Sequence, residues 1–545
     1  MGEPAKNLFV VGSKEGSENI LETIEKRRHS ELVFGFCGAV GAGTSTIADK
    51  LERNLIPYDY QVIKIKISDL LIDLIPKYKK EIDFTGDDDQ LKSNKNTRGK
   101  VLQDLGDFLR KKYGSGILAE LVIKHIALER DAIYTKSGKI LLQKSEDGTT
   151  EISIDPDIRI AWLVDSFKNP EEVEVFRHVY RNMFYLIGVL CPRDLRAQRL
   201  ESKGVSRIDA AEMIERDQSE GSDSGQQLIK TIHLSDFFIN NSHNNITNAE
   251  AELARILKII FGANISPTKP EFAMYVAYSA ALKSSCLSRQ VGAAIVNVKG
   301  DIISIGCNDV PKTGGGLYCY EDQAEDCRCI NMWYSACSND TGKKELKEQI
   351  QKQLNDAAFE DGVAEVCNSI KVILNGLLKE GTESEIEEKI KQKMLENVAD
   401  NSMKLAGKIA NETKIKQLTE YCRAVHAEMD AIVGAARNPN MGIAGADLYV
   451  TTFPCHNCAR HIVAAGIKRV YYIEPYEKSF ALRLHNDSIS TDEKASNKVI
   501  FLPFQGVAPR QYQNLFSIHS DRKTSGKAKK IDIKVAKPIN DMFID

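Results

Sequence analysis

One histidine and two cysteines in the C-terminal half of the chain are spaced as ligands of a zinc ion. His426 opens the segment HAE at 426–428, and Cys455 and Cys458 lie in the segment PCHNC at 454–458. Zinc prefers deprotonated sulfur and nitrogen ligands in a tetrahedron. A Cys-x-x-Cys turn at a helix N-terminus provides two thiolates, because the helix dipole lowers the thiol pKa there. We therefore expect His426, Cys455 and Cys458 to bind Zn²⁺.

Glu428 lies close enough to His426 in sequence to act on a metal-bound water. Three protein ligands leave the fourth position of the tetrahedron to water, and bound zinc lowers the pKa of that water to about 7. Glu428 can accept its proton and pass it on without binding the metal, as a general acid/base. The alternative is a closed structural site with His456 or His461 as fourth ligand, but such a site does not need Glu428.

The pairing of His-x-Glu with Pro-Cys-x-x-Cys is typical of zinc-dependent deaminases that act on cytosine or adenine. The segments 284–297 (SSCLSRQVGAAIVN) and 306–316 (GCNDVPKTGGG) resemble the first strands and the substrate loop of deoxycytidylate deaminases. This resemblance implies that Asn308 contacts the sugar or base of a nucleotide; the alternative is a turn residue after a strand. Arg289 and Lys312 are candidate phosphate partners by their charge, although any surface Arg or Lys would give the same pattern.

A second group of cysteines lies between these segments. Its members are Cys319, Cys327, Cys329 and Cys337. Four nearby thiols could hold a second zinc ion, but the spacing C-x7-C-x-C-x7-C matches no common zinc module. We therefore favour ordinary reduced thiols here, with a second zinc as the alternative.

A glycine-rich segment near the N-terminus, GFCGAVGAGTST at 35–46, follows an apolar run and opens a helical pattern. Gly38, Gly41 and Gly43 would let backbone N–H groups surround a phosphate at a helix N-terminus. The segment resembles the phosphate loop of nucleotide kinases, except that Thr44 stands at the usual lysine position. That lysine contacts the β- and γ-phosphates and stabilises the transferring charge, so kinase turnover is not expected.

Other residues fit a nucleotide site with Mg²⁺ around this loop. Ser45 and Thr46 remain as magnesium or phosphate ligands, and Asp165 ends an apolar run where such kinases place an acidic magnesium partner. The segment 165–173 (DSFKNPEEV) also resembles the kinase pattern. Three arginines follow the next apolar run, either as a lid or as one solvated helix face: Arg193, Arg196 and Arg199. A glycine turn without a ligand is the alternative for the loop.

Apolar runs alternate with helical patterns along the chain, which predicts an α/β fold. We expect a P-loop kinase-like three-layer domain over 1–262, a linker over 263–270, and a cytidine deaminase-like α/β/α domain over 271–520. Residues 341–420 are rich in Lys, Glu, Gln and Leu at helical spacing and predict a helical insertion. Residues 521–545 are basic at their start and poor in large apolar side chains, which predicts a mobile tail.

Composition limits the class of protein. Twelve cysteines, 42% hydrophobic residues and a net charge of −3 over 545 residues are ordinary for a globular protein and argue against a polynucleotide-coated surface. No run is apolar for the ~18 residues that a membrane span needs, and no signal peptide opens the chain. We therefore expect a cytoplasmic protein with reduced thiols and no membrane partner.

Taken together, these features resemble the bacterial anti-phage dCTP deaminases, also in the closing segment FLPFQGVAPRQYQNLF at 501–516. The resemblance implies deamination of dCTP, and of dCMP, to the uracil nucleotides, which depletes the pool that phage replication needs. It also implies control by a small RNA and assembly into homo-oligomers. The alternatives are a deaminase acting on tRNA or single-stranded DNA, a nucleotide kinase with a degenerate deaminase, and a non-enzymatic regulator or nucleotide-sensing scaffold.

Overall fold

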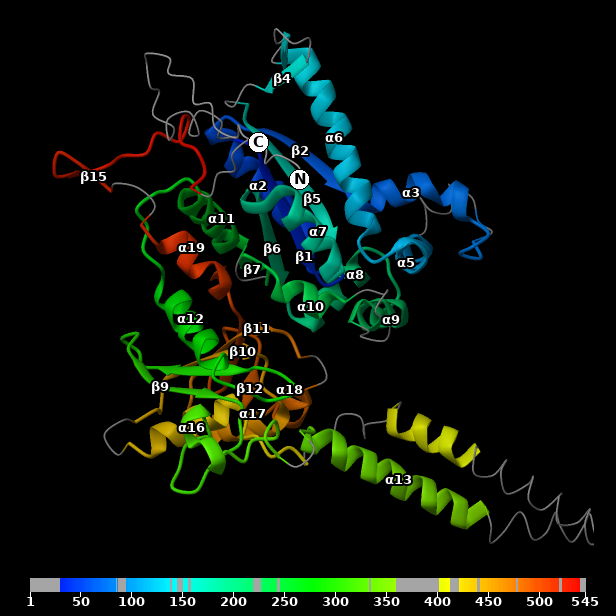
Figure 1. The fold of residues 1–545 in the computed structure, drawn as a ribbon, viewed down its shortest axis with the longest axis vertical. Coiled ribbons are helices and arrows are strands. Elements are labelled where there is room, and N and C mark those ends of the chain that lie inside the picture. Colours follow the sequence, from blue (N-terminus) through cyan, green and yellow to red (C-terminus); the bar gives the residue numbers. More distant parts are fainter. Residues whose placement is uncertain are drawn as a thin grey trace, which may run out of the picture.

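The computed structural model contains two α/β domains, one built around each of two six-stranded sheets (Figure 1). It describes residues 30–84, 86, 95–137, 140–144, 150–154, 158–218, 227–242, 246–332, 335–358, 401–411, 421–438, 442–476, 479–518 and 522–539.

The N-terminal sheet has the strand order β14-β7-β6-β1-β5-β2, and all its strands except β14 run parallel. Central strand β1 is buried along its whole length, as the unbroken apolar run at 32–37 predicts for a parallel sheet covered on both faces. The parallel strands are β1 (Leu32–Gly38), β2 (Gln61–Lys66), β5 (Ile160–Phe167), β6 (Phe184–Leu190) and β7 (Phe237–Asn240).

Helices cover both faces of this sheet and make the expected three layers. One face packs against α2 (Thr44–Leu55) and α11 (Ile246–Ile260), and the other against α3 (Ile67–Tyr78), α7 (Pro170–Tyr180) and α10 (Leu228–His233). The remaining elements of this half are η1 (Ile56–Tyr58), α5 (Lys95–Tyr113), α6 (Ile117–Ser137), β3 (Ile140–Lys144), β4 (Thr150–Ile154), η2 (Arg181–Met183), α8 (Arg193–Ser202) and α9 (Arg207–Gln218).

The second sheet has the order β12-β13-β11-β10-β8-β9. Its strands are β8 (Gly292–Val296), β9 (Ile302–Cys307), β10 (Asp447–Thr452), β11 (Arg469–Glu474), β12 (Ile489–Ser490) and β13 (Val499–Pro503). Strands β8 and β9 form an antiparallel hairpin around Gly300, and β10, β11, β13 and β12 run parallel. Helix α12 (Lys269–Ala281) packs on β8 and β10, while α16 (Ala427–Ala436) contacts the sheet alongside α17 (His456–Ala464).

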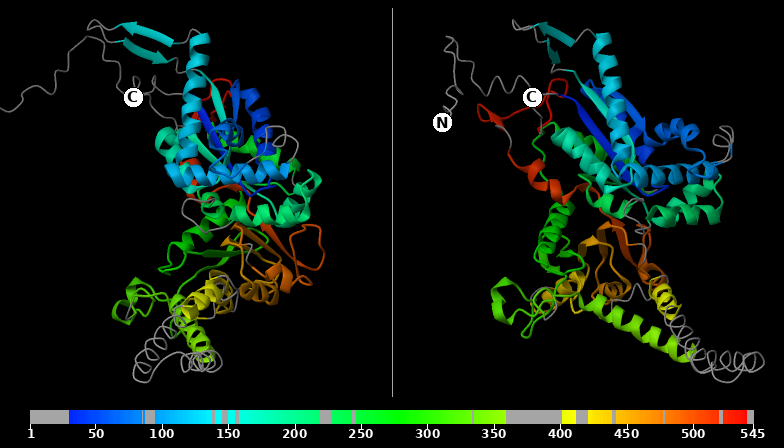
Figure 2. Two further views of the ribbon diagram at one scale, coloured as in Figure 1. Left: turned by 90° about the vertical axis from the view of Figure 1, so that its right-hand side faces the viewer. Right: turned by 45° about the vertical axis from the view of Figure 1, so that its right-hand side comes forward.

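Short elements and the insertion complete this half. The described parts of the predicted insertion are helical: α13 (Ser338–Ala358) and residues 401–411. Residues 359–400 and 412–420 of the same prediction lie outside the described residues. Helix α13 projects from one end of the molecule, opposite the β3–β4 hairpin (Figure 2). The short elements are η4 (Tyr320–Glu325), α18 (Ala481–Leu484), η7 (Pro509–Gln511), α19 (Tyr512–Phe516), β15 (Lys523–Thr524) and β16 (Lys527–Ala528).

The course of the chain after β13 disagrees with the predicted end of the second domain at residue 520. After β13 the chain returns to the N-terminal domain, where β14 (Gly506–Val507) pairs antiparallel with β7. The backbone N–H of Ala508 also donates to the Asp236 carbonyl at 2.9 Å. Residues beyond Pro503 therefore complete the first sheet, which local sequence patterns cannot reveal because the pairing joins segments far apart in the chain.

The expectation of a mobile tail is wrong for the described residues 522–539. The Arg159 guanidinium donates to the carbonyls of Ile533 at 3.2 Å and Ala536 at 2.8 Å. The backbone N–H of Ile539 donates to the Ile260 carbonyl at 2.8 Å, and Ala536 and Ile539 pack against the core of the N-terminal domain. A few apolar side chains thus anchor a segment that its basic composition predicts to be free.

Glu271 joins the two domains through its buried carboxylate. Helix α12 begins at Lys269, inside the predicted linker 263–270, and Glu271 forms a capping box with Thr268. The same carboxylate accepts two hydrogen bonds from Arg255 of α11, at 2.9 and 2.6 Å, and one from the backbone N–H of Val507 at 2.7 Å. One side chain therefore holds the start of α12, helix α11 and strand β14 together.

Replacing Glu271 with alanine should destabilise the protein strongly, because the buried N–H of Val507 loses its acceptor and Arg255 keeps only its hydrogen bond to Glu252 among the contacts described. We expect Glu271→Ala to lower the free energy of unfolding by about 3–5 kcal/mol, measured by urea denaturation followed by tryptophan fluorescence. Glu348→Ala is the control: that side chain is exposed and pairs only with Lys344 of the same helix, so no measurable change is expected. Equal stability of the two variants would contradict this role of Glu271.

Candidate metal centre and active site

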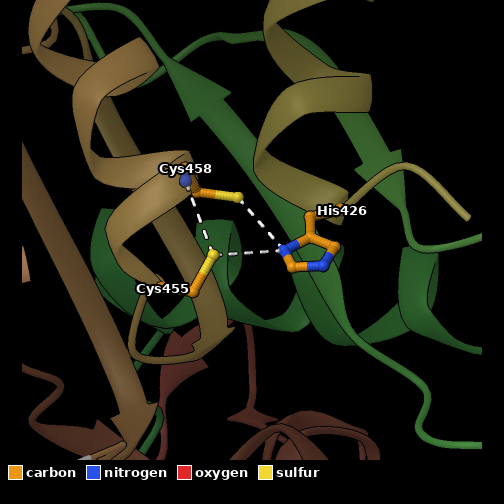
Figure 3. Close-up of side chains that lie close together, drawn as sticks. All are labelled: His426, Cys455 and Cys458. Carbon is orange, nitrogen blue, oxygen red and sulfur yellow. Dashed lines mark hydrogen bonds between the residues drawn. The ribbon is translucent and has the colours of Figure 1, made fainter. Parts of the chain in front are cut away.

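The predicted metal ligands occupy the starts of two helices on the second sheet. His426 is the N-cap of α16, and Cys455 is the N-cap of α17, where its sulfur accepts a hydrogen bond from the backbone N–H of Cys458 at 3.5 Å. Helix α17 follows β10 after a short turn, so the end of that strand fixes the position of Cys455. Figure 3 shows the three side chains pointing toward one another from the two helices.

The spacing of the three donor atoms fits a zinc ion. The Nδ1 atom of His426 lies 3.4 Å from Cys455 Sγ and 3.3 Å from Cys458 Sγ. Tetrahedral bonds of ordinary Zn–N and Zn–S length place such a nitrogen and sulfur about 3.6 Å apart. Within the described part of the chain, this is the only group of three or more His, Cys, Asp or Glu donors with such proximity. The donor set and its spacing agree with the predicted ligands.

The charge state of the donors also suits a metal. A hydrogen bond with Cys458, followed by contact with His426, lowers the pKa of Cys455 to about 4, so this thiol is ionised at neutral pH. The same contact with Cys455 raises the pKa of His426 to about 9. The imidazolium therefore balances the thiolate in the absence of a cation, and a metal ion would replace its proton.

Glu428 lies in the first turn of α16, where sequence reasoning placed the general acid/base. Its side chain is buried at 4% exposure, and this burial raises the pKa of its carboxyl group. A raised pKa brings a carboxyl group closer to the range in which it can both accept and return a proton, as general acid/base catalysis requires. Glu428 is not among the three clustered donors.

Small residues bring α16 close enough to the sheet to place His426 and Glu428. A Cβ atom on Gly306 of β9 would lie 2.3 Å from the Ala427 carbonyl oxygen and 2.4 Å from the Ala431 nitrogen. Only glycine permits this approach. Helix α16 presents alanines to the sheet, and its Asp430 carboxylate accepts a hydrogen bond from the backbone N–H of Cys307 at 3.1 Å. The sequence analysis missed Gly306, whose role depends on a helix distant in sequence.

Asn308 and Arg289, which were predicted to bind substrate, are joined by a hydrogen bond. Asn308 is buried; its Oδ1 atom accepts from the Val291 N–H at 2.6 Å, and its Nδ2 atom donates to the Arg289 carbonyl at 2.8 Å. The amide therefore fixes the turn before β8. The Arg289 side chain is 44% exposed and pairs with Glu474 at 2.8 Å.

Lys312 and the second cysteine group lie in the adjoining loop. Lys312 pairs with Asp322 at 2.5 Å, and Asp322 also accepts hydrogen bonds from the backbone N–H and the thiol of Cys319. The four cysteines Cys319, Cys327, Cys329 and Cys337 do not form a close donor group among the described residues. Lys312 therefore has an acidic partner, and reduced thiols remain a prediction for the four cysteines.

Glu474 is a site residue that sequence reasoning missed. It ends β11, is 3% exposed, and accepts hydrogen bonds from Thr452 at 2.8 Å and Arg289 at 2.8 Å. The Nε2 atom of His233, in the N-terminal domain, lies 2.9 Å from Glu474 Oε2, the oxygen that also accepts the Thr452 hydroxyl, whereas Arg289 donates to Oε1. In the sequence, Glu474 is recognisable only as a glutamate at the end of an apolar run. Such a pattern does not show whether the carboxylate is buried or exposed.

The glycine-rich loop lies at the carboxyl end of β1, between that strand and α2. Gly41 and Gly43 have φ angles of +82° and +89°, in the left-handed region that glycine adopts without strain. The loop brings Ser45 to Asp165, whose carboxylate accepts its hydroxyl at 2.5 Å. Gly38, Thr44 and Thr46 flank this pair, and β1 and β5 place their carboxyl ends side by side.

Basic side chains surround the same loop. Lys168 donates to the Gly38 carbonyl at 2.8 Å, and Arg199 donates to the Ala42 carbonyl at 3.1 Å. Arg196 is buried against the loop, with its guanidinium 3.4 Å from the Val40 carbonyl. Two of the three predicted lid arginines therefore contact the loop, and Lys168 adds a positive charge that the sequence analysis did not assign.

Residues 267–474 match the family described as the cytidine and deoxycytidylate deaminase zinc-binding region. The deoxycytidylate deaminase of Enterobacteria phage T2 is 49% identical over 55 residues, which are 10% of this chain and 29% of the phage protein. ComE operon protein 2 of Bacillus subtilis (strain 168) is 43% identical over 63 residues, which are 11% of this chain and 32% of that protein. The chain thus spans about a third or less of the length of these relatives.

Among solved structures, the dCMP deaminase of cyanophage S-TIM5 in complex with dCMP and dUMP has 15% sequence identity and a TM-score of 0.22. The match covers 44% of this chain and 99% of that chain. The family match includes His426, Glu428, Cys455 and Cys458. Residues 267–474 are therefore similar to the zinc-binding region of cytidine and deoxycytidylate deaminases.

Zinc content should depend on the three clustered donors and on no further histidine. We expect His426→Ala and Cys455→Ser to reduce bound zinc from about one ion per chain to almost none, because two ligands do not hold the ion. His456→Ala and His461→Ala should keep the wild-type zinc content, measured by atomic absorption on purified protein. Loss of zinc from either of these two variants would instead indicate the closed four-ligand site.

Proposed function

We propose that this chain is a zinc-dependent deaminase of free deoxycytidine nucleotides, with dCMP and dCTP as substrates. The observation that carries the proposal is the buried Glu428 beside three metal donors that meet at two helix N-termini. A three-ligand site with an adjacent carboxyl group is suited to hydrolysis, whereas a structural zinc site has four protein ligands. The relatives named deoxycytidylate deaminase support the substrate class.

The residues of the chain have distinct tasks in this reaction. His426, Cys455 and Cys458 would hold the zinc ion, which when bound activates water at neutral pH. Glu428 takes a proton from the attacking water and delivers protons to the ring nitrogen and the departing ammonia. Its burial keeps bulk water from competing for this proton, and its raised pKa favours the protonated form needed for delivery.

The phosphate and sugar end of the substrate would lie near the turn before β8. Arg289 is half-exposed, so its guanidinium can donate hydrogen bonds to a phosphate oxygen in addition to Glu474. Lys312 would have to leave Asp322 to do the same. Asn308 would act through the turn that its amide holds, with the sugar or base beside it.

The finer parts of the proposal are a dCTP preference, depletion of the dCTP pool in phage defence, restraint by a small RNA, and assembly into homo-oligomers. They rest on the likeness to the bacterial anti-phage enzymes.

Within the described residues, no helix is both long and apolar enough to cross a bilayer.

Replacing Glu428 should abolish deamination while leaving the metal in place. We expect purified wild-type protein to release ammonia from dCMP or dCTP, and Glu428→Gln to do so at least ~10²-fold more slowly with unchanged zinc content. CTP and a cytosine-containing oligonucleotide complete the set of substrates. Release from the oligonucleotide alone would favour a nucleic-acid deaminase, and no release from a zinc-loaded protein would favour a structural metal.

We further propose that the N-terminal domain binds the phosphates of a nucleotide, with Mg²⁺, as a regulatory ligand. The support is the loop at the carboxyl end of β1, the Ser45–Asp165 pair and the basic side chains around the loop. One carboxylate oxygen of Asp165 is buried without a hydrogen-bond partner, as expected of a residue that completes its coordination with a cation or its water. Thr44 at the lysine position favours binding over phosphoryl transfer.

A charged side chain at Ser45 should block this binding by repelling phosphate. We expect Ser45→Glu to reduce affinity for Mg²⁺-nucleotides at least tenfold in isothermal titration, with zinc content unchanged because the metal centre lies in the other domain. Ser45→Ala, which removes only the hydroxyl, is the matched control and should weaken binding less. Unchanged nucleotide affinity in Ser45→Glu would exclude the loop as the binding site.

A further inference from the structure

A histidine of the N-terminal domain contacts the edge of the deaminase site. His233 is the last residue of α10, and its Nε2 atom lies 2.9 Å from Glu474 Oε2 at the end of β11. The two residues belong to different domains. Glu474 is almost fully buried, whereas the His233 side chain is 44% exposed, so the histidine covers the carboxylate from the solvent side.

Glu474 is connected to the segment that carries the metal ligands. Its carboxylate accepts the hydroxyl of Thr452, the last residue of β10, at 2.8 Å. Its backbone carbonyl accepts the N–H of Phe453 at 2.8 Å. The chain then continues through Pro454 to Cys455. Any displacement of Glu474 therefore acts on a segment adjoining the metal centre.

The same carboxylate holds Arg289. Arg289 donates to Glu474 Oε1 at 2.8 Å, on the oxygen that His233 does not use. The Arg289 backbone is held separately, through the hydrogen bond from Asn308 to its carbonyl. The Glu474 carboxylate therefore orients the Arg289 guanidinium, and the Asn308 side chain holds the Arg289 backbone.

Electrostatics make the carboxylate depend on its donors. Burial alone would raise the pKa of Glu474, but the hydrogen bond and charge of His233, the charge of Arg289 and the hydroxyl of Thr452 outweigh it and lower the pKa. Glu474 is therefore an ionised group in a buried position, and such a group requires donors on both oxygens. Removing His233 leaves Oε2 with the Thr452 hydroxyl alone among the described donors, and so weakens the hold on the orientation of the carboxylate.

The N-terminal domain fixes the position of His233. Helix α10 is short, and its residues Leu228, Thr231 and Ile232 are buried in that domain. At its start, the backbone N–H of Gln227 donates to the Lys168 carbonyl at 2.9 Å. Lys168 in turn donates to the glycine-rich loop at Gly38. A direct chain of contacts therefore connects that loop, through α10, with Glu474.

We propose that His233 is a positioning residue of the deaminase site, which acts through Glu474 to orient Arg289 toward the substrate phosphate. The N-terminal domain then completes the phosphate end of a site whose metal and acid/base groups all belong to the other domain. This inference rests on the proposed function, because it gives Arg289 a phosphate to bind.

The test compares two substitutions that preserve bulk but differ in hydrogen bonding. His233→Leu removes the donor, and His233→Gln keeps a donor N–H near the position of Nε2. We expect His233→Leu to raise the KM for dCMP roughly tenfold with kcat changed less than about twofold, since uniform binding of a remote phosphate is lost. His233→Gln should restore most of the affinity. Deoxycytidine, which lacks the phosphate, should show no change in kcat/KM with either variant.

Two controls separate positioning from folding. Zinc content and Tm should match wild type in both variants, because the histidine is half-exposed and packs little. His178→Leu alters an exposed histidine of α7 that bonds only its own helix in the structure, at the Glu174 carbonyl, and should leave KM unchanged. An equal rise in KM for dCMP and deoxycytidine, an unchanged KM for dCMP in His233→Leu, or failure of His233→Gln to rescue would overturn the proposal.

Amide hydrogen exchange gives a readout that does not need turnover. The N–H of Phe453 donates to the Glu474 carbonyl, so its exchange reports the order of the segment that Glu474 holds beside the metal ligands. Exchange at Phe453 should become severalfold faster in His233→Leu and not in His233→Gln. If wild type deaminates no nucleotide, the proposed function fails and the positioning role fails with it, and an exchange response would then show only a structural link between His233 and Glu474. Normal deamination with unchanged exchange and KM overturns the positioning role alone.

Discussion

The candidate active site depends on two helices beginning at nearly the same point on one sheet. His426 caps α16, Cys455 caps α17, and the histidine nitrogen lies within 3.4 Å of both sulfur atoms. This meeting requires α16 to lie close against β9, which Gly306 permits because a larger residue would collide with the helix backbone. The same approach buries Glu428, and burial raises its pKa in the direction that proton transfer needs. The chemistry therefore follows from a packing constraint.

The two domains are held together by carboxylates as well as by apolar packing. Glu271 joins α12, Arg255 and strand β14, and Glu474 joins His233, Arg289 and Thr452. A buried carboxylate is costly unless donors surround it, so each of these groups fixes the positions of the elements that supply its donors. Apolar side chains from both domains also share one core, which includes Phe504 and Ala508 beside Phe238. The N-terminal domain is thus a structural neighbour of the candidate active site.

This arrangement gives the glycine-rich loop a physical route to the second domain. Lys168 contacts the loop at Gly38 and also the start of α10, and α10 ends at His233. A nucleotide that moved Lys168 would act on both ends of this route, because the helix is short and well buried. Coupling between sites requires an element that both sites can shift, and α10 is the element in contact with both.

The sequence by itself determined the chemistry, because ligand type and spacing are local: His426, Cys455, Cys458 and Glu428 follow from two short motifs, and the strands and helices around them follow from hydrophobic periodicity. It also predicted the glycine-rich turn and the acidic residue Asp165. Tertiary structure alone decided the rest. The pairing of β14 with β7, the docking of 522–539 and the contact between His233 and Glu474 join residues far apart in the chain, and no local pattern records them. Gly306 likewise gains its role only from the helix packed against it, since close approach is a property of two elements together.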